Sequence, residues 1–528
     1  MKQLTTATLR DLIGRRLSCE LRGDADQLVG PAVVRSSQDA QPGALFVAIA
    51  GERFDGHDFA ADAVEDGCAC LLVDRQLPLD VPQLIVPDTQ AGLSALAAAI
   101  VEDQLAAGQL TTLALTGSSG KTSTKDLLAQ IVANAGPTVA PQGSYNNEIG
   151  VPLTACRVDE QTRFLVSEMG ARTVGDIASL CQIVPPQIAA ILNIGVAHLG
   201  EFGSRENIAH AKGEIFDLLP ADGWAVINAD DDFAELLAQR VKANTQARIA
   251  YWAIDPPIMP SAELVVVARD LVADELDRYS FTLEASTAEQ VQSQRVQLQL
   301  ISRVQVANAL AASTMAIAAG LPLEQIAAAL NGATNRSQWR MAAESVTLAG
   351  GPAIIINDAY NANPGSMRAA LETLASIITK QRAQNEPARA IAIVGDMLEL
   401  GDDAAHIHHQ LGELAAELGV DQLIAVGEFA AEIVDGFQAR QPQADAAALP
   451  KDQIADHVQL RAGDVILVKA SRGIGLEEVA AELSSRYGNS DESPSAQESN
   501  QVWTGQDRQV EHSLPADHRT GDGEDPAA

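Results

Sequence analysis

The sequence predicts an α/β protein of about three domains, and three observations support this fold class. The chain has 528 residues, which is too many for one hydrophobic core. In its middle, an apolar run at 109–115, a glycine-rich loop and a helical pattern at 125–133 follow one another. From Pro352 the alternation of apolar strands and helices begins again, which is typical of a second doubly wound sheet.

Composition narrows the class of protein. Hydrophobic residues make up 47% of the chain and charged residues 20%, as in globular proteins that fold in water. A net charge of −34 argues against non-specific binding to nucleic acid or anionic membranes. No apolar run reaches about 18 residues, and the first residues hold no apolar signal-peptide core. We therefore expect a cytoplasmic protein without a membrane span.

The five cysteines favour buried, reduced thiols. Their number is odd, and they form no pair of CxxC units. Cys68 and Cys70 alternate with Ala69 in an apolar segment that has the pattern of a strand. A metal site or disulfide bonds are the less favoured alternatives.

Residues 1–107 are predicted to form a first α/β unit. Apolar segments at 44–49 and 69–73 have the length of buried strands, and the alanine-rich segment 89–106 has the composition of a helix. The unit ends just before the apolar run that leads into the glycine-rich loop, so we expect a domain boundary there.

Residues 108–334 are predicted to form the domain that carries the loop. Further buried strands are expected at 164–167, 188–192 and 225–227. Alternating apolar and polar residues predict a smaller, partly antiparallel sheet from 263–267, 279–283 and 296–300. A helix is expected at 304–319.

Residues 335–487 are predicted to form the second doubly wound sheet. Its strands are expected at 353–356, 390–394, 422–426 and 465–468. Pro364 is placed in the first turn of a helix, where its missing N–H costs nothing. The remainder, 488–528, is polar and acidic and is expected to be a disordered tail.

The loop at 117–122 is predicted to bind the phosphates of ATP. Between a strand and a helix, glycines let backbone amides turn toward a polyphosphate, and the helix N-terminus adds positive potential. The usual GxxxxGK[ST] pattern has glycine where this chain has Leu115, so the loop is more compact, and a structural turn is the alternative. The expected ATP-binding residues are Gly117, Ser118, Ser119, Gly120, Lys121, Thr122 and Ser123.

Three polar residues follow the strands after this loop. Glu168 ends one strand, His198 follows the next, and Lys212 lies shortly beyond. Ligands bind at the carboxyl edge of such sheets, where a carboxylate and an imidazole could hold a second Mg²⁺. Taken singly, each residue could instead be a surface or capping residue.

Seven stretches together resemble the Mur ligases, a family of ATP-dependent enzymes that form amide bonds in peptidoglycan precursors. The resemblance covers about residues 1–487. The stretches are Thr-Gly-Ser-Ser-Gly-Lys-Thr (116–122), Tyr-Asn-Asn-Glu-Ile-Gly-Val-Pro-Leu-Thr (145–154), Glu-Met-Gly-Ala (168–171), Asn-Ile-Gly-Val-Ala-His-Leu (193–199), Ala-Lys-Gly-Glu-Ile-Phe (211–216), Asn-Asp-Ala-Tyr-Asn-Ala-Asn-Pro (357–364) and Gly-Asp-Met-Leu-Glu-Leu-Gly (395–401). Several of them are similar to the branch that adds D-alanyl-D-alanine to UDP-N-acetylmuramoyl-tripeptide. The sister enzyme that adds the third residue carries Asp-Tyr-Ala-His where this chain has Asp-Ala-Tyr-Asn.

The resemblance implies a three-domain Mur ligase architecture. A UDP-sugar-binding N-terminal domain (1–107) would precede a central P-loop ATPase-like domain (108–334) and a C-terminal Rossmann-like ligase domain (335–487). It also implies roles near the phosphates: Lys121 on the β- and γ-phosphates, Thr122 on the first Mg²⁺, and Glu168 with His198 on the second. Lys212 matches a lysine that CO₂ carbamylates to support the metals, so Lys121, Lys212 and His198 are the expected catalytic residues.

The same resemblance implies further binding residues. Those expected around the nucleotide are Asn308, Arg340, Asp358, Asn361 and Asn363; those expected around the other substrates are Ser37, Phe46, Asn147, Ser471 and Arg472. Two departures stand out. Ser36-Ser37-Gln38 replaces the usual Asp-Ser-Arg of the UDP region, and Ala470 replaces glycine, which fits only if its φ is negative.

The implied activity is ATP-dependent amide ligation through an acyl phosphate, and we expect a monomer. The sequence leaves open whether the third residue of the peptide is lysine or diaminopimelate. Folylpolyglutamate synthase, which shares the compact loop, is one alternative. A P-loop ATPase that acts as a regulatory or assembly module without ligation is another.

Overall fold

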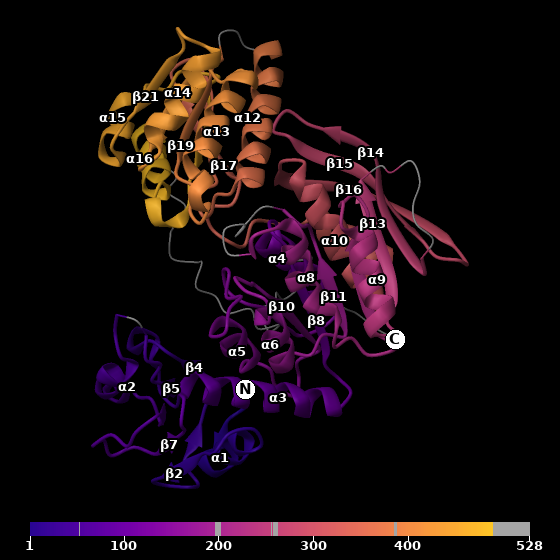
Figure 1. The fold of residues 1–528 in the computed structure, drawn as a ribbon, viewed down its shortest axis with the longest axis vertical. Coiled ribbons are helices and arrows are strands. Elements are labelled where there is room, and N and C mark those ends of the chain that lie inside the picture. The colour runs from indigo at the N-terminus through magenta and orange to yellow at the C-terminus, as the bar shows by residue number, and fades with distance from the viewer. Residues whose placement is uncertain (52, 196–201, 255, 257–261, 385–387, 489–528) are drawn as a thin grey trace, which may run out of the picture.

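The structure, a computed structural model, consists of three lobes that follow one another along the chain (Figure 1). It describes residues 1–51, 53–195, 202–254, 256, 262–384 and 388–488. In this part of the chain each lobe is built on one large sheet, of five, nine and six strands in chain order. No helix among the described residues has both the length and the apolar composition needed to cross a bilayer.

The N-terminal lobe carries the five-stranded sheet. Its elements are β1 (Leu4–Thr5), α1 (Thr6–Gly14), β2 (Glu20–Arg22), β3 (Leu28–Val29), β4 (Val33–Val34), η1 (Ser37–Asp39), β5 (Leu45–Val47), η2 (Gly56–Phe59), α2 (Ala60–Glu65), β6 (Cys70–Val73), β7 (Gln83–Ile85) and α3 (Thr89–Ala106). The strand order is β2-β7-β6-β5-β4, and β5 and β6 are buried along their whole length. Helix α3 has the predicted bounds, and Figure 1 shows it between this sheet and the central lobe.

The central lobe carries the nine-stranded sheet. Its elements are β8 (Thr111–Thr116), α4 (Lys121–Ala133), β9 (Thr138–Val139), α5 (Gly150–Ala155), β10 (Phe164–Glu168), α6 (Asp176–Ile183), β11 (Ile188–Ile191), α8 (Arg205–Gly213), η3 (Glu214–Phe216), β12 (Trp224–Asn228), α9 (Ala234–Asn244), β13 (Arg248–Ile254), β14 (Leu264–Ala273), β15 (Arg278–Ser286), β16 (Val291–Ile301), α10 (Val304–Ala318) and α11 (Leu323–Asn331). The order is β16-β15-β14-β13-β12-β11-β8-β10-β9. Helix α4 begins at Lys121, before the apolar pattern at 125–133 from which it was predicted.

The prediction of a separate, smaller sheet after β13 is wrong. Strand β14 pairs in parallel with β13, from Ala250↔Leu264 to Ile254↔Ala268, and so continues the main sheet. The antiparallel character is confirmed, because β15 pairs antiparallel with β14 and with β16. These strands therefore extend one edge of the sheet that carries the glycine-rich loop.

The C-terminal lobe carries the six-stranded sheet. Its elements are β17 (Ala342–Leu348), β18 (Gly351–Asn357), α12 (Pro364–Gln384), β19 (Ala390–Gly395), η4 (Gly401–Asp403), α13 (Ala404–Glu417), β20 (Gln422–Val426), α14 (Ala430–Arg440), β21 (Asp445–Ala448), η5 (Lys451–Gln453), α15 (Ile454–His457), β22 (Val465–Lys469), η6 (Arg472–Ile474) and α16 (Glu477–Tyr487). The order is β17-β18-β22-β19-β20-β21, with only β17 antiparallel. Side chains of α12, α13 and α14 pack in one core and those of α15 and α16 in another, as in a doubly wound sheet.

Two predictions about single residues are confirmed. Pro364 is the first residue of α12. All five cysteines are free thiols; Cys68, Cys70, Cys156 and Cys181 are buried as predicted, whereas Cys19 is only partly buried. Apart from Gly488, the predicted tail lies outside the described residues.

Candidate active site

A cleft of about 990 Å³ lies where the three lobes meet. Its wall includes Asp88 from the N-terminal lobe, the loop 118–123 from the central lobe and Lys469 from the C-terminal lobe. The predicted site residues that line it are Ser118, Ser119, Gly120, Lys121, Thr122, Ser123, Asn147, Glu168, Asn308, Arg340, Asp358, Asn361 and Asn363. The fold thus brings most of the predicted ATP-binding residues to one place.

The loop between β8 and α4 requires its glycines. A Cβ at Gly117 would lie 2.9 Å from the Cβ of Leu192. Gly120 has a φ of +80°, and a Cβ there would lie 2.6 Å from Asn308 Oδ1. Gly120 caps α4 without a side-chain hydrogen bond, which leaves the first amides of the helix available to an anion.

Lys121 is a half-buried cation at the start of α4. Its Nζ donates to the carbonyl oxygen of Gly117 at 2.9 Å. Burial lowers the pKa of Lys121, the nearby Glu168 carboxylate raises it, and the Arg340 guanidinium lowers it. The site therefore favours an anion that would stabilise these cations, as phosphate does.

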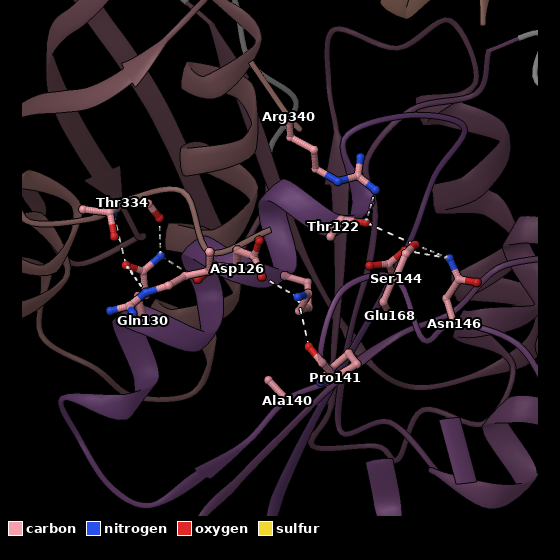
Figure 2. Close-up of polar contacts among 12 residues, drawn as sticks. Thr122, Asp126, Gln130, Ala140, Pro141, Ser144, Asn146, Glu168, Thr334 and Arg340 are labelled. Carbon is pink, nitrogen blue, oxygen red and sulfur yellow. Dashed lines mark hydrogen bonds and ion pairs between the residues drawn. The ribbon is translucent and has the colours of Figure 1, made fainter. Parts of the chain in front are cut away.

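Glu168, at the end of β10, is a buried carboxylate at the centre of a chain of polar side chains (Figure 2). Its Oε1 accepts hydrogen bonds from Ser144 Oγ at 2.9 Å and from Asn146 Nδ2 at 2.7 Å. Thr122 Oγ1 lies 3.3 Å from Ser144 Oγ, which links the chain to the glycine-rich loop. Glu168 Oε2 is buried and has no hydrogen-bond partner among the described residues, so this oxygen is available to a ligand.

This chain of oxygens fits Mg²⁺. The described residues contain no group of three or more His, Cys, Asp or Glu side chains that could hold a metal by themselves. Mg²⁺ typically takes one or two carboxylates and completes its shell with substrate phosphates and water. The hydroxyl of Thr122 and the unpaired oxygen of Glu168 supply such hard ligands next to the loop.

Of the predicted catalytic residues His198 and Lys212, the structure describes only Lys212. His198 lies outside the described residues. Lys212 lies in α8 and is only 1% exposed. Burial, together with the positive charge of Lys121, lowers the pKa of Lys212 to about 7, so a large share of it is neutral near neutral pH.

Arg340 reaches the loop from the segment that joins the central and C-terminal lobes. Its Nη2 donates to Thr122 Oγ1 at 2.9 Å, and its guanidinium lies 4.1 Å from the ring centroid of Tyr360. The Nε atom is buried without a hydrogen-bond partner among the described residues. Arg340 thus carries an unused donor at the wall of the cleft, where a phosphate oxygen could accept from it.

Asn308, on α10, packs against the other side of the loop. Its Oδ1 lies 3.2 Å from Thr124 Oγ1, and its Nδ2 donates to Gln305 Oε1 at 3.0 Å. The first bond joins α10 to α4, the second lies within α10, and together they fix the orientation of the amide. The predicted contact of Asn308 with the nucleotide stays a prediction, and its position in the cleft wall is compatible with it.

The C-terminal lobe contributes an ion pair to the cleft. Lys469 Nζ lies 2.5 Å from Asp358 Oδ2 and donates to the carbonyl oxygen of Asn361 at 2.8 Å. Asn363 Oδ1 accepts from Ser366 N at 2.9 Å, which caps the start of α12. Asp358 and Asn363 thus have structural partners as well as a place in the cleft wall.

The residues predicted for the other substrates are dispersed. Asn147 lines the cleft, while its Oδ1 accepts from Gly150 N at 2.9 Å. Ser37 begins the short helix η1 in the N-terminal lobe, outside the cleft wall. The Phe46 side chain is 0% exposed in the core of that lobe, so in this structure it cannot contact a ligand directly.

Ser471 and Arg472 flank the cleft without lining it. Ser471 Oγ accepts from Leu398 N at 3.1 Å. The Arg472 guanidinium lies 4.3 Å from the ring centroid of Trp339 and forms an ion pair with Glu477. Their predicted role in substrate binding stays a prediction.

Three residues of the site were not predicted. Ser144 and Asn146 hold Glu168, and Lys469 pairs with Asp358. Asn146 lies within the stretch 145–154 quoted above, two residues after Ser144, and Lys469 directly follows a predicted strand. The sequence signal for such residues is a position near the end of a strand. This position does not show which carboxylate the side chain will bind.

Three family descriptions match consecutive parts of the chain. Residues 33–115 match "Mur ligase family, catalytic domain", residues 115–316 match "Mur ligase middle domain", and residues 339–472 match "Mur ligase, glutamate ligase domain". The matches fall on the N-terminal, central and C-terminal lobes in that order.

Whole proteins and solved structures are also similar. The chain is 39% identical to a UDP-N-acetylmuramoyl-tripeptide–D-alanyl-D-alanine ligase of Mycobacterium tuberculosis (strain ATCC 25618 / H37Rv), over 92% of this chain and 98% of that one. It is 37% identical to the protein of that name from Escherichia coli (strain K12), over 92% and 99%. A crystal structure of MurF from Acinetobacter baumannii superposes with a TM-score of 0.76 at 32% identity, over 92% and 99%. MurF ligase from Thermotoga maritima in complex with ADP superposes with a TM-score of 0.67 at 27% identity, over 86% and 98%.

Proposed function

The chain belongs to the Mur ligase family, and we propose that it uses ATP to join D-alanyl-D-alanine to UDP-N-acetylmuramoyl-tripeptide. It is thus a carbon–nitrogen ligase of peptidoglycan precursor synthesis. The observation that carries this function is a cleft in which the glycine-rich loop meets side chains of both other lobes. Such a cleft can hold a nucleotide, a carboxylate and an amine at once.

The reaction has two steps. A carboxylate is a weak electrophile, so one oxygen of the tripeptide carboxylate first bonds to the γ-phosphorus of ATP, and ADP leaves. The amine nitrogen of the dipeptide then bonds to the carbonyl carbon of the acyl phosphate. Inorganic phosphate leaves, the nitrogen loses a proton, and an amide remains. Little covalent chemistry falls to the protein, so positioning and charge are its main contributions.

Residues of the central lobe act on the transferred phosphoryl group. Gly117 and Gly120 let the loop backbone approach the phosphates, and Lys121 would exchange its bond to Gly117 for a phosphate oxygen. Thr122 and Glu168 would hold Mg²⁺, which neutralises charge on the phosphates when bound. Arg340 adds a guanidinium from the segment before the C-terminal lobe.

We further propose that Lys212 is carbamylated. Only a neutral amine adds to CO₂, with loss of a proton, and the lowered pKa of Lys212, about 7, supplies that form. The resulting carbamate is an anion that could support a second Mg²⁺ together with Glu168 and His198. Lys212→Ala should be nearly inactive and partly restored by short-chain carboxylates, while an unmodified ammonium in a nucleotide-bound crystal would contradict the proposal.

Phosphate release tests the ligase function. It should require ATP, a UDP-N-acetylmuramoyl-tripeptide and D-alanyl-D-alanine together, and the product mass should equal the two substrates less one water. Tripeptides that end in lysine and in diaminopimelate, compared in parallel, would identify the preferred substrate. Release without either peptide would instead indicate an ATPase module, and release with a folate and glutamate would indicate a folylpolyglutamate synthase.

We also propose that the enzyme is a monomer that works in the cytoplasm. The cleft draws its walls from three lobes of one chain, so no second copy is needed to complete it. ATP and UDP-sugars are cytoplasmic substrates. Light scattering coupled to gel filtration would test the oligomeric state, and a mass of twice the chain would contradict a monomer.

A further inference from the structure

The segment that joins the central and C-terminal lobes runs from the end of α11 to the start of β17. It is anchored at both ends. Thr334 is bound to helix α4 of the central lobe, and the stretch 339–341 is bound to the C-terminal lobe. Residues 335–338 lie between these anchors, and of them Arg336 also contacts Gln130 through its side chain. We expect the two lobes to change their relative position in this stretch.

Gln130, on α4, forms the upstream anchor (Figure 2). Its Nε2 donates to the carbonyl oxygen of Thr334 at 3.0 Å, and its Oε1 accepts from the amide nitrogen of Thr334 at 3.1 Å. The same Nε2 donates to the carbonyl oxygen of Asp126 at 3.0 Å, and Arg336 Nε approaches Oε1 at 3.4 Å. Both donors and both lone pairs of the amide are thus engaged, which leaves it one orientation.

The downstream anchor holds Arg340 in place. Tyr360 N donates to the carbonyl oxygen of Trp339 at 3.1 Å, and Met341 N donates to Asp358 Oδ1 at 3.0 Å. Trp339 and Met341 both have positive φ, at 56° and 48°, which is a constrained backbone for side chains of this size. Arg340 lies between them and reaches back to Thr122 on α4.

Helix α4 therefore meets the joining segment twice. Thr122 near its start contacts Arg340, and Gln130 farther along contacts Thr334 (Figure 2). Helix α4, which begins at the glycine-rich loop, therefore also holds the segment that leads into the C-terminal lobe. Displacement of Thr334 along α4 would move Arg340 relative to the phosphates.

We propose that Gln130 is a positioning residue for the ligation. Gln130 fixes Thr334 to α4, and the C-terminal lobe moves relative to this fixed point. When the lobe moves, Arg340 is therefore held at the glycine-rich loop. Gln130 does not line the cleft, so its effect reaches ATP only through the joining segment. The predicted effect of Gln130 on ATP turnover rests on the proposed function.

The chemistry of the anchor explains the choice of glutamine. Thr334 offers one donor and one acceptor from its backbone, and a primary amide matches both at once. Glutamate has no donor and would place a carboxylate beside the carbonyl oxygens of Thr334 and Asp126. Methionine has the length of glutamine but neither polar function, so it would leave the Thr334 backbone unpaired.

Steady-state kinetics of Gln130→Met would test this role. We expect KM for ATP to rise about tenfold, the equivalent of one well-placed hydrogen bond to the nucleotide, with a smaller change in kcat. Asn134→Ala is the matched control, because Asn134 directly follows the last residue of α4 and, among the described residues, its side chain donates to the Gln130 carbonyl oxygen and not to Thr334. If KM for ATP is the same in Gln130→Met, in Asn134→Ala and in the wild-type enzyme, the proposal is wrong.

A double-mutant cycle separates positioning from general destabilisation. If Gln130 acts through Arg340, Gln130→Met should add no further rise in KM to Arg340→Ala. If the rise in KM in the double variant equals the product of the rises in the two single variants, the proposal is wrong. Gln130→Glu, which keeps the shape of the side chain, is the second variant if Gln130→Met does not fold, and the same two outcomes apply.

Hydrogen exchange provides a readout that does not depend on ligation. The Thr334 amide donates to Gln130, so it should exchange faster in Gln130→Met and be unchanged in Asn134→Ala. Calorimetry with ADP should show the matching loss of affinity. If the unchanged protein binds ADP but releases no phosphate with the two peptides, the proposed function fails while these measurements still decide the role of Gln130.

Discussion

Lys121 combines a flexible charged side chain with a fixed position at the start of α4, and its removal should affect turnover more than folding. We expect Lys121→Ala to lower turnover at least about 10²-fold, because a preorganised charge at a transferring phosphoryl group contributes several kcal/mol. The melting temperature should change little, since the Nζ atom makes one hydrogen bond, to Gly117. Near-normal turnover in a phosphate-release assay would refute the assignment of this loop.

Lys212 should make stability depend on pH in a defined direction. Its pKa is about 7 in the folded protein, against an ordinary value of 10.5. Between these values the unfolded chain binds the proton and the folded one does not, so the cost of burying this lysine is full below about pH 7 and disappears above 10.5.

Replacement of Lys212 by methionine should therefore raise the free energy of unfolding most at low pH. Denaturant titrations in buffer free of CO₂, at about pH 6 and about pH 10, would measure the difference. The gain should be larger at the lower pH. A gain that is equal at both, or larger at the higher pH, would show that the folded state does not lower this pKa.

At the scale of elements, the alanine at position 470, where the family usually has glycine, is accommodated by a glycine on the neighbouring strand. Ala470 follows β22 where glycine is usual, and its φ is not positive, so alanine fits there. Its Cβ lies 2.9 Å from where a Cβ at Gly395, the end of β19, would be. The two strand ends therefore have room for one methyl group between them.

This contact predicts how the two strand ends depend on each other. Gly395→Ala should destabilise the protein by about 1–3 kcal/mol, because an added methyl group would collide with Ala470. Ala470→Gly in the same chain should recover part of that loss. Thermal unfolding of the single and double variants would measure it, and strictly additive effects would contradict the contact.

The elements that could be predicted are those whose signals are local. Helix α3 has its predicted bounds because Asp88 caps it, with Oδ1 accepting from Ala91 N at 2.7 Å, and because its apolar residues are continuous. The pairing of β14 with β13 could not be predicted, because strand partners are chosen by the whole sheet. The Glu168–Ser144 bond is likewise tertiary, since it joins the last residue of β10 to the segment between β9 and α5.

At the scale of the whole molecule, the site depends on how the lobes are joined. The central and C-terminal lobes also touch away from the cleft, where Asp277 accepts from Ser376 Oγ at 2.6 Å and lies 3.2 Å from Lys380 Nζ. Together with the joining segment, this contact gives the C-terminal lobe two supports on the central one. We therefore expect movement between the lobes to be a rotation about these two contacts rather than a free displacement.

Closure of the three lobes around the substrates is the expected consequence. Lys121 comes from the central lobe and Asp358, Asn361 and Asn363 from the C-terminal lobe, so no lobe can assemble the site alone. We expect ATP and the UDP-peptide together to close the cleft by rigid-body rotation near 107 and 335, which would keep water from the acyl phosphate. Small-angle scattering should then show a smaller radius of gyration with both ligands than without them. An unchanged radius, measured where the same preparation is active, would mean that the lobes are already arranged for catalysis and that closure plays no part.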